Sequence, residues 1–326
     1  MKNKFNSAAT VKVSCGLLAG MLAPGVVHAC ACGCGVFDVA TSSMFPNGAG
    51  GMAYLQYDFQ DQNRNWSGTS QAPAANNGDK QIETDFFTAG LQYMFNRSWG
   101  VQLEVPYDYR TFKTTSAAPG NPITTINWGA LGDIRVEGIY TGFFADLSAG
   151  VTFGVKLPTG DWTFNNAFGD VDRDSEIGTG STDILLGGFY RGNLDRNQKW
   201  DWFGQLQLDV PVLIQAEYRP GVELDAAAGI DYKGFSLGRV KISPLAQVIF
   251  SERTSDSGAN AAGGANDDPT GGVSSGYQRI MLSPGIEFHI HPVKIYADAE
   301  FPVYQNFTGN QLAAPVLFKV SLSFMF

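Results

Sequence analysis

The sequence predicts an all-β protein: a transmembrane antiparallel up-and-down β-barrel of about twelve strands, with both termini on the periplasmic side. Three observations predict this class. Segments in which apolar and polar residues alternate recur from residue 51 to residue 326. Long loops alternate with short turns between these segments, as is typical of membrane barrels. After residue 29 the sequence has no run of about twenty apolar residues, which excludes a membrane protein built of helices.

The first 29 residues have the pattern of a secretory signal peptide, with basic Lys2, Lys4 and Lys12, an apolar stretch, and a Val27-His28-Ala29 cleavage site. Their removal leaves 19 Lys and Arg against 31 Asp and Glu, a formal charge of −12. So acidic a chain excludes nucleic acid as a partner. Charged residues make up 16% of the chain, against about 25% in soluble domains. This composition favours a barrel in the bacterial outer membrane over the alternative, a soluble secreted β-protein.

Residues 30–50 form a cysteine-containing periplasmic lead-in ahead of the barrel domain at 51–326. Three interpretations are open for Cys30, Cys32 and Cys34. In the first, Cys30 is the lipid-modified first residue of a lipoprotein. In the second, the thiols form or exchange disulfides in the oxidising periplasm. In the third, the thiolates hold Cu(I) or Zn(II), because soft ligands select such ions. The sequence predicts no other cofactor.

The alternating segments give the barrel strands in order. The first places Ala53, Leu55, Tyr57 and Phe59 on one face, with polar residues between them. Further strands are expected at about 83–95, 99–110, 129–142, 143–157, 181–191, 199–214, 222–232, 238–252, 277–290, 293–305 and 313–326. The long loop 158–180 contains Asp170, Asp172, Asp174 and Glu176, which we expect to be a solvated acidic strip at the surface.

The last segment alternates most regularly: every second residue from Val316 to Phe326 is apolar, and Lys319, Ser321 and Ser323 stand between them. A terminal strand that ends in phenylalanine resembles the closing strand of bacterial outer-membrane barrels, where this ending acts as an assembly signal. The resemblance implies that the apolar face meets lipid and lipopolysaccharide. It also implies that the assembly machinery recognises Phe326.

Proline recurs inside three predicted strands in one local pattern, an acidic residue, an apolar residue, then proline. These prolines are Pro106, Pro211 and Pro302. Each removes a ladder hydrogen bond and should mark a bulge or kink. Two interpretations are open: the prolines curve the wall, or they break it so that an apolar substrate leaves sideways.

Three landmarks in the middle of the chain are Gly132-Asp133-Ile134-Arg135, Lys156-Leu157-Pro158-Thr159-Gly160-Asp161 and Gly178-Thr179-Gly180-Ser181-Thr182-Asp183. With Phe326, their order resembles the family of outer-membrane barrels associated with meta-pathway phenol and aromatic degradation, over about residues 83–326. The resemblance implies a porin-like transporter for uptake of small hydrophobic or aromatic solutes. The three cysteines lie outside that pattern.

Charged residues on the polar faces of the strands should project into the lumen. A twelve-stranded barrel has a narrow interior, so opposed charges there either select solutes or pair and close the lumen. The candidates are Glu104, Asp108, Arg110, Asp133, Arg135, Glu137, Lys156, Asp209, Arg279, Glu300 and Lys319.

Two hypotheses of function follow. In the first, the barrel passes small, hydrophobic or aromatic solutes by passive diffusion. In the second, it serves a periplasmic redox or metal-handling partner through Cys30, Cys32 and Cys34. The sequence contains none of the common hydrolase, nucleotide-binding or metalloprotease motifs, so we do not expect an enzyme.

Overall fold

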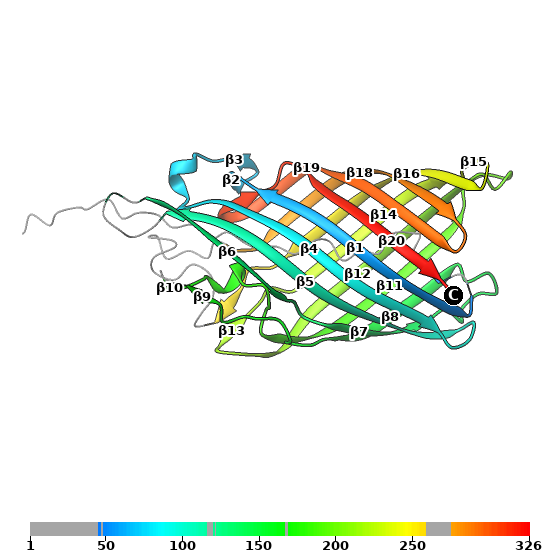
Figure 1. Cartoon of the computed structure of the whole chain (residues 1–326), viewed down its shortest axis with the longest axis horizontal. Helices are drawn as coiled ribbons and strands as arrows, with labels where there is room; N and C mark the ends of the chain where they lie inside the picture. The colour runs from blue at the N-terminus through cyan, green and yellow to red at the C-terminus, as the bar shows by residue number, and fades with distance from the viewer. Residues whose placement is uncertain (1–44, 47, 116–119, 121, 167–168, 259–274) are drawn as a thin grey trace, which may run out of the picture.

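The computed structural model describes residues 45–46, 48–115, 120, 122–166, 169–258 and 275–326. Twelve antiparallel wall strands close into one barrel, which confirms the predicted fold class (Figure 1). One wall strand is interrupted and consists of β6 and β7. The wall strands are β1 (Gly50–Gln62), β4 (Asp79–Met94), β5 (Trp99–Thr115), β6 (Ile123–Leu131), β7 (Arg135–Tyr140), β8 (Ala149–Lys156), β11 (Ser181–Asn193), β12 (Trp200–Ile214), β14 (Glu223–Tyr232), β16 (Val240–Arg253), β18 (Tyr277–Ile290), β19 (Val293–Ala313) and β20 (Leu317–Met325).

The first and last wall strands close the barrel. β1 pairs with β20 from Met52 opposite Met325 to Gln60 opposite Leu317. On β20 the side chains alternate as predicted: Lys319 and Ser321 are buried, whereas Phe318 and Val320 are 45% and 43% exposed. The apolar face therefore points outward and the polar face points into the lumen.

Large apolar side chains are exposed around the outside of the whole wall. Examples on separate strands are Leu55, Leu103, Phe153, Leu186 and Leu282. In water so large an apolar surface would be unfavourable, but in hydrocarbon it matches the surroundings, while the closed sheet pairs most of the backbone within the wall. Among the residues that the structure describes, no helix is long and apolar enough to cross a membrane.

The two ends of the barrel differ. At one end, which we call the short-turn end, β1 begins and β20 ends (Figure 1). The longest connections, 63–78, 157–180 and 254–276, all lie at the opposite end, which we call the loop end. β5 and β19 run further towards the loop end than predicted, to Thr115 and Ala313.

Short secondary-structure elements lie at both ends of the barrel. At the loop end are the strands β2 (Arg64–Gly68), β3 (Ser70–Gln71), β9 (Asn165–Asn166), β10 (Gly169–Asp170), β13 (Tyr218–Arg219) and β17 (Ser257–Gly258), and the 3-10 helices η2 (Ala74–Asn76) and η3 (Arg173–Ser175). At the short-turn end β15 (Phe235–Leu237) forms a small hairpin with β16.

Candidate functional site

The wall is broken at one place, in the strand predicted at 129–142. This strand is two pieces, β6 and β7, separated by Gly132, Asp133 and Ile134. β7 pairs with both β5 and β8, whereas β6 pairs with β5 only, because β8 ends at Lys156. Towards the loop end, β6 and the start of β11 therefore lack a strand between them. Loop 157–180 fills this gap, and we call the gap the wall break.

The three sequence landmarks meet at the wall break. The carboxylate of Asp133 accepts a hydrogen bond from the Gly160 amide at 2.9 Å, and from the Thr179 amide and hydroxyl at 2.8 and 2.6 Å. The Thr159 hydroxyl donates to the Gly132 carbonyl and accepts from the Ile134 amide. One buried carboxylate thus ties both ends of loop 157–180 to the interrupted strand.

The two ends of this loop touch, and we call the contact the neck. The Gly178 amide donates to the Asp161 carbonyl at 2.7 Å. A Cβ atom on Gly178 would lie 2.3 Å from the carbonyl carbon of Gly160, so a side chain at this position would displace backbone. The landmark glycines are thus explained by close backbone approach.

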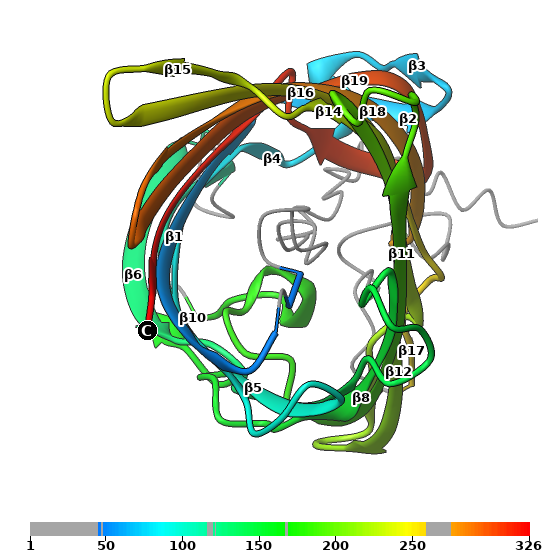
Figure 2. The same ribbon diagram turned by 90° about the vertical axis from the view of Figure 1, so that its right-hand side faces the viewer.

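Loop 157–180 folds into the barrel, so the predicted surface strip is wrong. Figure 2 looks along the barrel and shows the segment around β10 inside the ring of strands. Asp174 and Glu176 are 5% and 6% exposed. Apolar residues of the loop explain this position, because Val171 and Ile177 pack against Trp128 and other inward side chains of the wall. The acidic residues of the loop indicate an exposed segment, so the local sequence does not reveal this packing.

A second contact fixes the loop at its tip. The Arg173 guanidinium lies over the Trp162 ring at 4.4 Å and over the Tyr218 ring at 4.7 Å, and it donates to the Thr179 carbonyl. Arg110, a predicted lumen residue, donates to the carbonyls of Ser175 and Glu176. Cation–π contacts and charge-assisted hydrogen bonds therefore hold the loop inside the lumen.

Docking of this loop should weaken as the pH rises. Burial raises the pKa of the Glu176 carboxyl to about 8 from its ordinary value of 4.5. The docked loop therefore binds this proton more tightly than the released loop does, and docking loses stability between pH 4.5 and pH 8. Hydrogen exchange of residues 171–180, corrected for intrinsic rates, should show falling protection over this range. Glu176→Gln should flatten the dependence, and an unchanged slope in that variant would contradict the assignment.

Below the wall break, four charged side chains form what we call the Lys156 cluster. Lys156 Nζ contacts a carboxylate oxygen of Asp183 and lies 3.2 Å from Asp209 Oδ2. Arg135 Nη2 lies 3.5 Å from the same oxygen of Asp209. These residues come from β7, β8, β11 and β12 and are largely buried. The cluster lines a central cavity of about 160 Å³, together with the predicted residues Asp108, Arg110 and Asp133.

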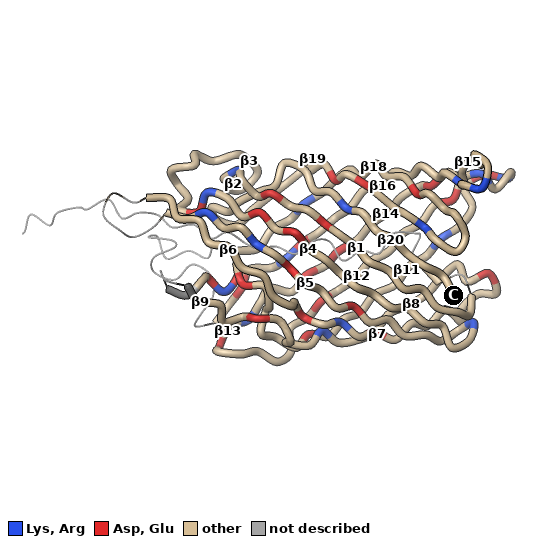
Figure 3. Tube along the Cα trace, viewed as in Figure 1, with Lys and Arg blue, Asp and Glu red and all other residues tan. Residues whose placement is uncertain are grey.

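A second group lies across the lumen, where β19, β20 and β1 adjoin. Lys319 Nζ is 3.6 Å from Glu300 Oε1 and 3.8 Å from Asp58 Oδ1. Arg279 is buried on β18 and lies over the Tyr277 ring at 4.0 Å. The predicted charges are therefore divided between two sides of the barrel rather than gathered in one ring. Figure 3 shows acidic and basic residues spread along the strands over the length of the barrel.

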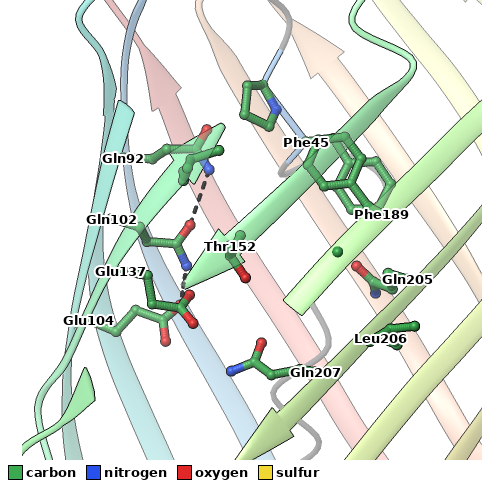
Figure 4. A pocket seen from close by; sticks show the side chains of 13 residues that line it. Phe45, Gln92, Gln102, Glu104, Glu137, Thr152, Phe189, Gln205, Leu206 and Gln207 are labelled. Carbon is green, nitrogen blue, oxygen red and sulfur yellow. Dashed lines mark hydrogen bonds between the residues drawn. The ribbon is translucent and has the colours of Figure 1, made fainter. Parts of the chain in front are cut away.

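A second cavity, nearer the short-turn end, is lined by glutamines, two glutamates and apolar residues. Gln92 donates to Gln102, and Gln102 donates to Glu104 (Figure 4). Glu137 lies beside Glu104 in the same cavity. Phe45, from the lead-in, stacks on Phe189 at 4.4 Å between ring centroids. Phe45 and Pro46 thus line this cavity from inside the barrel.

The three strand prolines mark irregular places in the wall. The β11–β12 ladder shifts register next to Pro211, and the β18–β19 ladder shifts next to Pro302. Pro106 lies on β5 beside the wall break, where its carbonyl oxygen accepts a hydrogen bond from the Gly132 amide at 2.9 Å. Bulges therefore accompany two of the prolines and the interruption accompanies the third.

Sequence reasoning missed several residues of the site. Asp58 and Asp183 stand on polar faces of predicted strands, so the same alternation would have identified both as lumen charges. Thr179 stands within a sequence landmark, but no local pattern indicates its hydrogen bonds to Asp133 or the contact of Arg173 with Tyr218. Cys30, Cys32 and Cys34 lie outside the described residues. Within the described ranges, no group of three or more His, Cys, Asp or Glu side chains is arranged to hold a metal ion.

Comparison with solved structures shows the fold. An outer-membrane channel from Pseudomonas putida F1 aligns over 89% of this chain and 100% of its own length, with a TM-score of 0.58 and 11% identity. The β domain of the Bordetella autotransporter BrkA aligns with a TM-score of 0.49, 12% identity, and coverage of 85% of this chain and 100% of that one. The monoaromatic hydrocarbon channel CymD aligns with a TM-score of 0.42, 8% identity, and coverage of 85% and 89%.

The first of these likenesses confirms the fold of an outer-membrane β-barrel. No protein-family profile and no curated protein sequence matches the chain.

Proposed function

We propose that the protein is an outer-membrane channel that passes small, hydrophobic or aromatic solutes by passive diffusion, and that these solutes leave sideways through the wall break. The P. putida protein with the same fold is an outer-membrane channel. The proposal assigns no catalytic step to the chain.

The wall break is the observation that carries the sideways route. Exposed apolar side chains stand around its outer rim: Leu131 at the end of β6, Leu157 after β8, Ile184 on β11 and Leu213 on β12. An apolar solute that leaves the lumen here enters hydrocarbon and gains about 25 cal/mol for each Å² removed from water. Along the axis it would instead meet the Lys156 cluster and then the glutamines near Glu104.

The proposed orientation places the short-turn end in the periplasm and the loop end outside the cell, as short turns and long loops are arranged in known outer-membrane barrels. Lipid and lipopolysaccharide then surround the apolar exterior. The assembly machinery would recognise the closing strand through Phe326, whose side chain is 60% exposed.

We expect the protein to speed the entry of a neutral aromatic probe into vesicles whose outer leaflet is lipopolysaccharide, because that leaflet is the barrier to apolar solutes. The fluorescence of N-phenyl-1-naphthylamine, which rises on entry into hydrocarbon, measures the rate. Swelling of the same vesicles in a sugar solution tests the axial route and should be much slower. Equal probe rates with and without the protein would refute the channel. Fast sugar entry would refute the sideways route.

A further inference from the structure

We propose that Met52, Met94 and Met325, at the short-turn end of the barrel, bind the soft monovalent ion Cu(I) through their thioether sulfurs. The three side chains line one cavity of about 200 Å³, which Phe45 and Phe326 also border. This site is separate from the wall break, and it does not depend on the solute-channel function.

The three methionines lie on neighbouring strands and face the lumen. Met325 on β20 is the direct cross-strand partner of Met52 on β1. On the other side of β1, Met52 pairs with Gln92, and Met94 follows two residues later on the same face of β4. Cross-strand pairs place Cβ atoms about 4.5–5.5 Å apart and diagonal neighbours about 7–8 Å apart. These separations are within reach of long, flexible side chains.

Two of the three methionine side chains are in contact, and the sulfur of the third is turned away from them. Met52 and Met325 already pack together. Met94 carries its Sδ over Gly100 of β5, where a Cβ atom would lie 2.3 Å from the sulfur. Rotation about the three flexible bonds of its side chain swings this sulfur towards the other two. Gly50, the partner of Met94 on β1, has no side chain to obstruct that movement.

The lining selects for a soft ion. Apart from the methionines, the cavity is bordered by aromatic, proline, glycine, alanine and glutamine side chains, none of them charged. Mg²⁺ and Ca²⁺ prefer carboxylate oxygens, and Zn²⁺ prefers thiolate, imidazole or carboxylate ligands. Thioether sulfur is a ligand that Cu(I) accepts without any deprotonation.

Sulfur is concentrated at this end of the molecule. After residue 29 the sequence has five methionines: Met44, Met52, Met94, Met281 and Met325. Three line the cavity, and Met44 directly precedes Phe45, another lining residue. Met281 differs, because it fills the apolar cluster around Ile249 and Leu317 with no exposed surface. Met52, Met94 and Met325 differ from Met281 in that all three border one cavity.

Cys30, Cys32 and Cys34 precede this cavity along the chain. Cys34 is eleven residues before Phe45, so an extended chain between them spans at most about 40 Å. The cysteines lie outside the described residues and form no part of the proposed site.

The test is competition for Cu(I) between the detergent-solubilised full-length protein and bicinchoninate, without oxygen, followed by the absorbance of the bicinchoninate complex. The wild type should withdraw Cu(I) from the dye. The effect of the methionines is measured with Cys30, Cys32 and Cys34 replaced by serine, so that no thiolate holds the ion. In this background the combined Met52→Leu, Met94→Leu and Met325→Leu variant should bind at least about tenfold more weakly than its serine parent, because leucine keeps the volume and removes the sulfur. Met281→Leu, the matched control, should bind as the serine parent does.

A variant with Cys30, Cys32 and Cys34 replaced by serine should retain one Cu(I) ion, held by the thioethers. The proposal is overturned if the triple leucine variant in the serine background competes as well as its serine parent, or if the serine parent binds no Cu(I). A heat-dependent shift on a denaturing gel shows for each variant that the barrel is folded. Vesicle entry of the aromatic probe is measured in parallel, and the triple leucine variant should retain it.

Discussion

Replacing Lys156 with methionine should lower the free energy of unfolding of the barrel by about 3–5 kcal/mol, because it leaves buried carboxylates without their counter-ion. Lys156 contacts both Asp183 and Asp209, and these three residues are 8%, 1% and 7% exposed. Arg135 remains beside Asp209 in this variant, so the unpaired charge falls mainly on Asp183. Urea unfolding of the refolded barrel in detergent micelles, followed by tryptophan fluorescence, measures the loss.

Two further variants separate charge from packing. Lys233→Met removes a comparable ion pair with Asp201, but these side chains are 37% and 31% exposed, so its cost should be no more than about 1 kcal/mol. Adding Asp183→Asn to Lys156→Met should restore most of the lost stability, since the uncompensated charge is gone. Equal losses for Lys156→Met and Lys233→Met would show that the lumen is hydrated enough to screen the Lys156 cluster.

The barrel could be predicted from the sequence because a membrane wall imposes a regular pattern on every strand. Each strand has one face in hydrocarbon and one in the lumen. Alternation alone therefore predicts that Phe318 faces hydrocarbon and Lys319 faces the lumen. The same alternation placed Glu300 and Arg279 in the lumen. It could not show which charges meet, because pairing across the lumen depends on the number of strands and on their register.

The wall break was not predicted, although the residues that form it were identified. Gly132-Asp133-Ile134-Arg135 was expected within a continuous strand, but the interruption of three residues reverses the alternation: Leu131 faces outward on β6, whereas Glu137 and Ile139 are buried on β7. The acidic residues of loop 157–180 indicated an exposed loop, because local charge does not reveal a contact such as Arg173 with Tyr218. The three landmarks were identified through a resemblance to a protein family. In the structure the hydrogen bonds of Asp133 join them, which is a physical reason for their occurring together.

Replacing Asp133 with asparagine should release loop 157–180 from the wall break. The carboxylate accepts three hydrogen bonds, from the Gly160 amide and from the Thr179 amide and hydroxyl, whereas an asparagine side chain has one acceptor oxygen. Leaving even one buried amide without a partner costs about 1–3 kcal/mol, which raises the population of the open neck by about 5- to 150-fold. Trypsin should then cut after Arg173, which the docked loop protects.

If the neck is the gate of the sideways route, the same variant should also admit the aromatic probe faster, while sugar entry stays slow. Gly178→Ala should act in the same direction by a different cause, because its Cβ would collide with the backbone of Gly160. Gly204→Ala is the matched control, since its Cβ would meet its nearest neighbour at 3.9 Å. Cleavage at Arg173 without faster probe entry would mean that the loop opens but solutes do not leave there. Faster sugar entry would mean that the loop instead obstructs the axis of the lumen.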